Sequence, residues 1–360
     1  MTTLDSYISL GRSGLRVSPL SLGTMTFGED NGWGTSPEAC EAILAEYLDR
    51  GGNVVDTANI YTNGHSEKII GDFFAAQPGL RDRVVLSTKF FANLYPGDPN
   101  GGGGGRKALI AQLEESLRRL QTDYVDLYWL HGWDRRAPIE ETLRTLDDLL
   151  AAGKVRYVGL SDVPAWVAAQ GHTIAHFRGW APVTALQLEY SLLERTPEGE
   201  LLPMAEALGV GVLPWSPLRG GQLSGKYVRD GSAPADSRRA DLTGRPTERD
   251  WVVIDAVARV ASEIGVGSAQ VALAWVRSRP AVTSTIIGAR TIEQLRSNLG
   301  SLEITLAPEQ LAALDEASTP SLDFPATVFG PGQMLGFGGA TVDGVELPVW
   351  PGLLTSSARY

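Results

Sequence analysis

Four polar residues in the first part of the chain have the types and positions for acid–base chemistry. Asp56 ends a short apolar run and Tyr61 follows it, Lys89 lies near the end of the next such run, and His131 ends a third. A tyrosine hydroxyl has a pKa of about 10, so it exchanges protons poorly at neutral pH unless a nearby cation stabilises its anion. Lys89 could supply that cation, and Asp56 could keep the lysine charged and in place.

His131 completes a set that could reduce a carbonyl group. Its imidazole could donate a hydrogen bond to the carbonyl oxygen and orient it while Tyr61 protonates that oxygen. No side chain can deliver a hydride, so the set implies a nicotinamide cofactor. Each residue also has an ordinary explanation: Asp56 as a helix cap, Tyr61 as a half-buried aromatic ring, Lys89 as a solvated strand end and His131 as a core histidine. Convergence of all four on one rim favours the chemical explanation.

The apolar runs that carry these residues alternate with longer helical patterns, as in repeated strand–helix units with a parallel sheet. Eight such runs occupy residues 18–26, 53–58, 84–90, 125–131, 155–162, 183–190, 211–218 and 284–289. The first seven follow one another at near-regular intervals, and a longer gap precedes the eighth. This pattern predicts an α/β fold, a closed (β/α)8 TIM barrel, with its active site at the C-terminal ends of the strands. We expect a single domain over residues 1–360, with its core at 18–318.

Helix signals stand between the runs. Ser36, Pro37 and Glu38 supply a cap, a first-turn proline and a first-turn acid, and leucines recur with a helical period over residues 106–120. Residues 138–152 repeat that design. Three further parts fall outside the repeat. A hairpin at 7–17 could plug the N-terminal end of the barrel. A polar loop at 219–247 is followed by helices at 248–264 and 268–279, and a last helix at 308–318 precedes a Gly/Pro-rich tail at 319–360 with little periodicity.

Two segments in the second half of the chain could bind the phosphates of a cofactor. Residues 215–227 leave the seventh predicted strand and form a loop with glycines, backbone donors and two cations, and residues 287–290 lead from the eighth strand into a helix at Thr291. In barrels, phosphate often binds between these two loops at a helix N-terminus. Arg290 is placed where a guanidinium could bind a phosphate, although position alone also fits a plain surface arginine.

Composition limits the class of partner. The chain has 31 Lys and Arg against 42 Asp and Glu, a net charge of −11, so it offers no basic surface for nucleic acid or an anionic membrane. A small molecule is the expected partner. No run approaches the roughly 20 apolar residues of a membrane helix. The start of the sequence lacks a signal-peptide pattern and Cys40 is the only cysteine, so we expect a cytoplasmic protein.

The motifs at the predicted strand ends resemble those of the aldo-keto reductases, over roughly residues 9–318. They lie at residues 22–28, 56–58 with Tyr61, 87–89, 126–128 with 130–131, 159–161, Gln187, 216–218 and 287–290. The resemblance implies a (β/α)8 barrel that binds NADP(H) without a metal and reduces an aldehyde or ketone to an alcohol, usually reversibly. Residues 129–134 and 322–326 look most like the bacterial branch near aryl-alcohol dehydrogenases and potassium-channel β-subunits.

The resemblance also implies a role for each matching residue. Tyr61 would be the general acid, tuned by Lys89 and Asp56, and His131 would orient the carbonyl group. Trp215 would stack on the nicotinamide ring. The implied cofactor-binding residues are Gly23, Thr24, Met25 and Asp56; Ser161 and Gln187 on the carboxamide, with Asp162 nearby; Trp215; Ser216, Pro217, Leu218, Gly220 and Lys226 near the pyrophosphate; and Gly288, Arg290, Gln294 and Asn298 towards the adenosine 2′-phosphate. Ser297 stands where related branches often place an acid against the adenine.

The substrate pocket is expected to be lined by Trp33, Phe90 and Trp133. Aromatic walls would favour flat or apolar carbonyl compounds, although the same rings could equally be packing. Gly132, beside His131, leaves room that fits a bulkier substrate.

Three other functions stay open at this point. Lys89 could be the Schiff-base nucleophile of a barrel aldolase, or the chain could be an NADP(H)-binding regulatory subunit with little turnover. A Rossmann-type dehydrogenase is disfavoured because the sequence has no GxGxxG; the glycine run at 101–105 is predicted to be a plain loop. The sequence leaves open the substrate, the reaction direction, the role of the tail and the oligomeric state, and an oligomer is possible.

Overall fold

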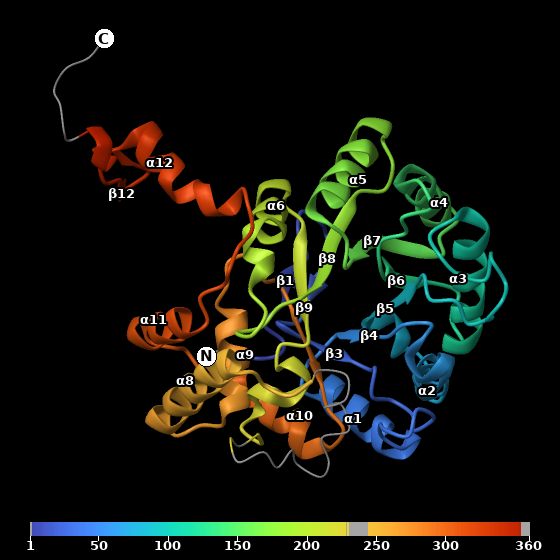
Figure 1. Cartoon of the computed structure of the whole chain (residues 1–360). Coiled ribbons are helices and arrows are strands. Elements are labelled where there is room, and N and C mark those ends of the chain that lie inside the picture. The colour runs from blue at the N-terminus through green and yellow to red at the C-terminus, as the bar shows by residue number, and fades with distance from the viewer. Residues whose placement is uncertain (1, 228, 230–243, 354–360) are drawn as a thin grey trace.

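The computed structural model describes residues 2–227, 229 and 244–353, and its centre is a barrel of eight parallel strands (Figure 1). In spatial order they are β10 (Thr285–Gly288), β3 (Leu20–Gly23), β4 (Val54–Asp56), β5 (Val85–Phe90), β6 (Val125–Leu130), β7 (Val155–Ser161), β8 (Val183–Glu189) and β9 (Gly211–Trp215). A bridge between Val212 and Val282 brings β9 beside β10 and nearly closes the ring. The predicted (β/α)8 barrel is confirmed.

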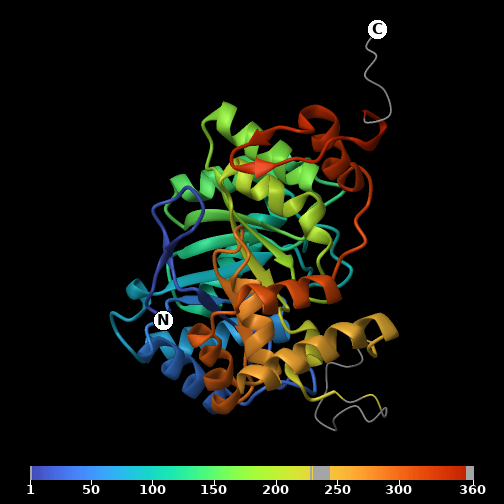
Figure 2. The same ribbon diagram turned by 90° about the vertical axis from the view of Figure 1, so that its left-hand side faces the viewer.

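Helices surround the barrel in both views (Figure 2). They are α1 (Pro37–Asp49), α2 (His65–Ala75), α3 (Arg106–Leu120), α4 (Ile139–Ala151), α5 (Ala165–Arg178), α6 (Leu201–Leu208), α8 (Glu248–Ile264), α9 (Ser268–Arg277), α10 (Ile292–Leu299) and α11 (Pro308–Ala317). The predicted cap is present at α1, where the Ser36 hydroxyl accepts from the Ala39 N–H at 3.4 Å and Pro37 opens the helix. Local signals therefore set where several of these helices begin.

The strands are shorter than predicted at their C-terminal ends. Residues 24–26, 57–58 and 216–218 continue the apolar or small-residue runs, but the sheet ends at Gly23, Asp56 and Trp215. The backbone beyond these points turns into loops at the rim. A run of apolar residues in the sequence indicates burial. Because these loop residues are largely buried too, the run does not show where the strand ends.

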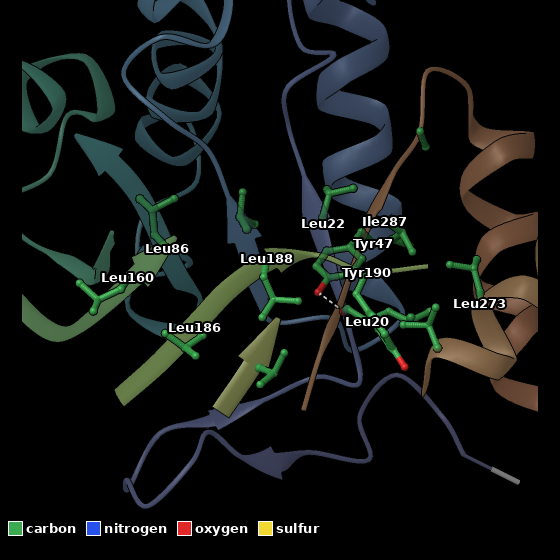
Figure 3. Packing of buried hydrophobic residues seen from close by; sticks show 14 of the residues in the cluster. Leu20, Leu22, Tyr47, Leu86, Leu160, Leu186, Leu188, Tyr190, Leu273 and Ile287 are labelled. Carbon is green, nitrogen blue, oxygen red and sulfur yellow. Dashed lines mark hydrogen bonds between the residues drawn. The ribbon is translucent and has the colours of Figure 1, made fainter. Parts of the chain in front are cut away.

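Apolar side chains fill two layers, one between the barrel and the helices and one inside the barrel. Trp129 of β6 occupies the barrel interior beside Gly159 of β7. A Cβ on Gly159 would lie 2.2 Å from the Trp129 ring, so glycine is required for this close approach. In the outer layer Tyr47 of α1 packs with Leu20, Leu22 and Ile287 (Figure 3), and its hydroxyl donates to the Leu20 carbonyl at 2.8 Å.

The N-terminal hairpin closes the N-terminal end of the barrel, as predicted. It pairs β1 (Ile8–Ser9) with β2 (Arg16–Val17) and is dark blue in Figure 2. Leu10 and Val17 are fully buried in the inner layer. Gly11 approaches β9 so closely that a Cβ would lie 2.7 Å from the Gly211 nitrogen. Plugging this end leaves the opposite rim as the accessible one.

The tail is more structured than its lack of periodicity predicts. It forms a short turn, η6 (Ala326–Val328), then α12 (Phe329–Phe337) and a hairpin of β11 (Thr341–Val342) with β12 (Val345–Glu346). The long loop after β9 begins with η4 (Arg219–Ser224); residues 228 and 230–243 of the predicted loop lie outside the described residues. Of the helices described, none is long and apolar enough to cross a membrane.

Candidate active site

Three neighbouring strands, β4, β5 and β6, bring the acid–base residues to the C-terminal rim of the barrel. Asp56 is the last residue of β4, Lys89 is the penultimate residue of β5, and His131 follows β6 directly. Tyr61 opens the short helix η1 (Tyr61–Gly64) after β4. Parallel register sets Asp56 opposite Ser87 and Lys89 opposite Trp129.

Lys89 is the centre of the site, and its ammonium group is fully hydrogen-bonded. Its Nζ donates to Asp56 Oδ2 at 2.5 Å, to the Thr57 carbonyl at 2.9 Å and to the Tyr61 hydroxyl at 3.0 Å. Burial by itself lowers the pKa of Lys89, but the negative charge of Asp56 and the hydrogen bonds to Asp56 and Tyr61 outweigh it and leave the pKa above its ordinary value. A charged amine with all three protons engaged is a hydrogen-bond donor to Tyr61 and a poor nucleophile.

The Asp56 carboxylate is buried, and every partner it has is a donor. Oδ2 accepts from Lys89, while Oδ1 accepts from the Ser87 hydroxyl at 2.6 Å and from the Gln187 amide at 3.1 Å. The sequence pattern gives Ser87 no role, and the family resemblance implies that Gln187 binds the cofactor. In the structure both side chains also donate to the Asp56 carboxylate. These hydrogen bonds compensate the free-energy cost of burying its charge.

Tyr61 is oriented by a strained turn. Thr62 and Asn63 have φ of 45° and 56°, in the left-handed region that a β-branched threonine rarely adopts. The Thr62 hydroxyl donates to the Phe27 carbonyl at 2.8 Å and accepts from the Ser66 N–H at 3.1 Å, so the turn is held from two sides. Non-glycine residues kept in this region often mark functional sites.

His131 faces Tyr61 edge-on, with ring centroids 5.9 Å apart and planes at 78°. Burial, together with the positive charge of Lys89, lowers the pKa of His131 to about 3. The imidazole is therefore neutral at neutral pH, with one N–H to donate.

This lowered pKa predicts a loss of stability in acid. Between the ordinary pKa of 6.5 and about 3, the unfolded chain binds a proton that folded His131 does not. Lowering the pH through that window therefore favours unfolding, by at most about 1.4 kcal/mol per pH unit. Urea unfolding at several pH values is expected to show this slope in the difference between the wild-type protein and His131→Gln. A difference that does not change with pH would contradict the prediction.

A second group of predicted residues lies on β7 and β9. The Trp215 indole donates to Asp162 Oδ1 at 3.0 Å, and the Ser161 hydroxyl donates to Asp162 Oδ2 at 3.1 Å. Asp162 and Ser216 have φ of 51° and 53°, both left-handed. The Asp162–Trp215 bond fixes the indole at the mouth of the barrel.

The loop after β9 forms a compact turn. Gly220 and Gly221 have φ of 60° and 96°, and the Gly220 N–H donates to the Ser216 hydroxyl at 3.3 Å. A Cβ on Gly221 would lie 2.9 Å from Lys226 Cε, so glycine is needed for the lysine side chain to fold back over the turn. Of the other residues predicted here, Leu218 is half-buried and Pro217 is buried.

The remaining cofactor candidates surround the end of β10. Gly288 is exposed and Arg290 is half-buried, and the Arg290 N–H donates to Gln294 Oε1 at 2.8 Å. Thr291 caps α10, as its position predicts, by accepting from the Gln294 N–H at 3.2 Å. Asn298 is buried and its amide donates to the Gly288 carbonyl at 3.0 Å, so it supports this corner from behind.

The strand β3 contributes differently from the prediction. Gly23 and Met25 are half-buried at the rim. Thr24 is fully buried, and its hydroxyl donates to the Asp56 carbonyl at 3.0 Å. Thr24 therefore positions the backbone of Asp56 and has no surface to offer a cofactor.

Phe90 is not in the substrate pocket. It is fully buried against Tyr128, with ring centroids 4.7 Å apart, in the layer between barrel and helices. Strand side chains alternate, and Lys89 points into the barrel, so Phe90 must point outwards. Its neighbour Phe91 has a φ of 128°, which breaks the alternation, and lies 3.5 Å from the Cβ position of Gly132.

Two tryptophans form an aromatic rim beside His131. Trp133 is half-buried and packs edge-on against Trp166 of α5, with ring centroids 5.4 Å apart and planes at 90°. The Arg135 guanidinium lies 4.9 Å from the centre of the Trp133 ring. Trp33 is half-buried in the loop after β3. Trp166 was missed, although its position just after Pro164 at the end of the fifth predicted strand places it on the rim.

No group of three or more His, Cys, Asp or Glu side chains arranged to hold a metal ion occurs in the described part of the chain.

Comparison with known proteins agrees with this geometry. Residues 19–319 match the model of the aldo/keto reductase family. The chain is 41% identical over 319 residues to an uncharacterized oxidoreductase, YrpG, of Bacillus subtilis, covering 86% of this chain and 95% of YrpG. It is 33% identical over 339 residues to an NADP(+) aryl-alcohol dehydrogenase of Phanerodontia chrysosporium, covering 89% and 87%. It is 35% identical over 323 residues to norsolorinic acid reductase of Aspergillus flavus, covering 87% and 81%. A match over this much of the chain, on a barrel with these groups at its rim, makes the protein an oxidoreductase of the aldo/keto reductase family.

Proposed function

We propose that this protein uses NADPH to reduce an aldehyde or ketone to an alcohol, with Tyr61 as the proton donor. One observation carries the proposal: the buried chain Asp56–Lys89–Tyr61 ends in a hydroxyl that faces a neutral His131. The alternative is a regulatory subunit that binds NADP(H) with little turnover.

The four residues divide the acid–base work. His131 donates a hydrogen bond to the carbonyl oxygen of the substrate and holds it near the Tyr61 hydroxyl. Tyr61 gives its proton to that oxygen, and the Lys89 ammonium, 3.0 Å away, stabilises the phenolate that is left. Asp56 keeps Lys89 charged and in place. When bound, NADPH supplies the hydride to the carbonyl carbon and leaves as NADP+.

The residues at the far side of the rim fit such a cofactor. Trp215 is held at the mouth by Asp162 and offers a flat face for a nicotinamide ring. The turn at Gly220 and Gly221, with Lys226 folded over it, offers a cation for a pyrophosphate. Arg290 at the start of α10 is placed for the 2′-phosphate.

Aromatic carbonyl compounds are the proposed substrate class. Phe91 lies against Gly132, the residue after His131, and Trp133 has a half-buried ring that packs on the exposed ring of Trp166. Rings at a binding site favour flat apolar ligands. The names of two relatives, an aryl-alcohol dehydrogenase and norsolorinic acid reductases, support the same class.

Fluorescence titration of the purified protein with NADPH and NADH, followed by the loss of NADPH absorbance with aromatic and aliphatic aldehydes, tests the proposal. We expect tighter binding of NADPH and faster turnover of aromatic aldehydes. Tight binding without turnover of any carbonyl compound would favour the regulatory subunit. Absence of binding would reject the proposal, and a covalent adduct on Lys89 after borohydride would favour the aldolase.

Arg290→Ala is expected to weaken NADPH binding about 10–100-fold, because a charge-assisted hydrogen bond contributes about 1.5–3 kcal/mol. NADH lacks the 2′-phosphate, so its affinity is expected to change little. Arg296→Ala is the control: Arg296 lies on α10, the helix that follows Arg290, but its guanidinium is paired with Glu46 at 2.8 Å. Equal losses for both cofactors would show that Arg290 does not contact the 2′-phosphate.

A further inference from the structure

The C-terminal arm, residues 319–353, carries most of the strongly exposed large apolar side chains of the described residues. Nine large apolar side chains among the described residues are more than half exposed, and five of them belong to this arm: Phe324, Phe329, Leu335, Phe337 and Val345. Isolated exposed apolar residues are ordinary, whereas a cluster in one short segment marks an interaction surface.

The arm is a folded unit that the barrel hardly holds. Arg249 donates to the Thr319 carbonyl at 2.8 Å, and Leu322 lies 3.5 Å from the Cβ position of Gly199. Beyond these attachments, α12 packs mainly against η6 of the same arm. The Gly339 N–H donates to the Leu347 carbonyl at 2.7 Å, which extends the pairing of the hairpin towards α12. Figure 1 shows α12 and β12 standing apart from the ring of helices, beyond α6.

A second exposed apolar surface lies on α5. Trp166 and Phe177 are 59% and 81% exposed, and they account for two of the four other residues that are more than half exposed. They are eleven positions apart, three helical turns, so they share one face of the helix. Gln170 and Thr173 complete this face, which carries no charged side chain. We call these four residues the α5 face.

The arm and helix α5 differ in charge. The arm contains Asp323, Asp343 and Glu346 and no lysine or arginine. Helix α5 contains no acid and ends in Arg178. Within the chain α5 packs on α4, α6 and β8, and in Figure 1 the arm lies on the other side of α6 from α5.

We propose that the C-terminal arm of one copy of this chain docks on the α5 face of a second copy, and that the exchange is reciprocal. Two different patches on each chain then form two equivalent contacts around a twofold axis, which closes the assembly as a dimer. Apolar burial supplies the main attraction, while the acidic arm and Arg178 favour this pairing over contact between two arms.

Light scattering after size-exclusion chromatography tests this on four proteins at one concentration: the full chain, a chain ending at Ser318, Phe177→Glu, and the control Val252→Glu. Val252 is an exposed apolar residue on α8, outside both surfaces. We expect dimers for the full chain and the control, and monomers for the other two. Cooperative thermal unfolding would show that the monomers are folded, even where the loss of the dimer lowers the midpoint. Phe177→Glu keeps the test valid if the shortened chain does not fold.

Mixing the two monomeric variants distinguishes arm-to-face docking from other dimers. The shortened chain keeps an intact α5 face and Phe177→Glu keeps an intact arm, so together they can form one of the two contacts. We expect a heterodimer that accumulates as the concentration rises. A monomeric full chain, a dimer that survives either change, or folded variants that never associate would each overturn the proposal.

Discussion

Tyr61→Phe is expected to lower the rate of carbonyl reduction by about 10²–10⁴-fold, the usual contribution of a positioned general acid. The substitution removes only the hydroxyl that accepts from Lys89 at 3.0 Å and leaves the ring beside His131. The residues proposed to hold NADPH are untouched, so its dissociation constant is expected to stay the same. Single-turnover reduction of an aromatic aldehyde, with fluorescence titration of NADPH, measures both quantities.

Tyr95→Phe is the matched control, because Tyr95 is 55% exposed on the loop before α3 and away from the acid–base residues. Wild-type turnover in Tyr61→Phe would refute the assignment of Tyr61 as proton donor. A rate loss accompanied by an equal loss of NADPH affinity would instead point to a disturbed cofactor site.

Lys89→Met is expected to abolish reduction and also to destabilise the fold by about 3–5 kcal/mol. Methionine is unbranched and only one atom shorter than lysine, but it leaves the Asp56 carboxylate buried without its cation. Removing one partner of a buried ion pair typically costs this much, because the remaining charge is uncompensated. Urea unfolding measures the stability, and single-turnover kinetics measure the rate. Lys107→Met, at an exposed position on α3, is the control and is expected to change neither.

The double variant Lys89→Met/Asp56→Asn separates the two effects. It removes both charges, and asparagine can still accept from Ser87, so most of the lost stability is expected to return. Reduction is expected to stay absent, because Tyr61 has no cation to stabilise its phenolate. Recovery of activity together with stability would show that the pair serves only to hold the fold.

The acid–base residues could be located from the sequence because two features of the local sequence determine their positions. Lys89 and His131 stand at the ends of apolar runs, and runs in a repeated strand–helix pattern end at the same rim. Caps and periodicity located several helices equally well: α3 and α8 have the predicted bounds, and Pro37 opens α1. Such signals act over a few residues, so the sequence displays them directly.

Contacts between distant parts of the chain were beyond the sequence pattern. Gln187 donates to Asp56 across 131 positions, and Thr24 supports the Asp56 carbonyl from the neighbouring strand. Each of these side chains was predicted to face the cofactor. A buried amide or hydroxyl can hydrogen-bond to either of two polar partners. The register of the strands in the closed barrel determines which of them it contacts.

The amino-acid sequence by itself determined the barrel, the order of its elements and the strand ends that carry Asp56, Lys89 and His131. The tertiary structure decided which side chains at those ends turn inwards. Phe90 was predicted to line the pocket and is core, whereas Phe91, with φ of 128°, lies beside Gly132. The arm likewise shows no periodicity in sequence but folds as α12 and a hairpin. Residue type and spacing encode burial and local backbone preference, but where a chain leaves a sheet depends on packing around it, and that packing exists only in the folded molecule.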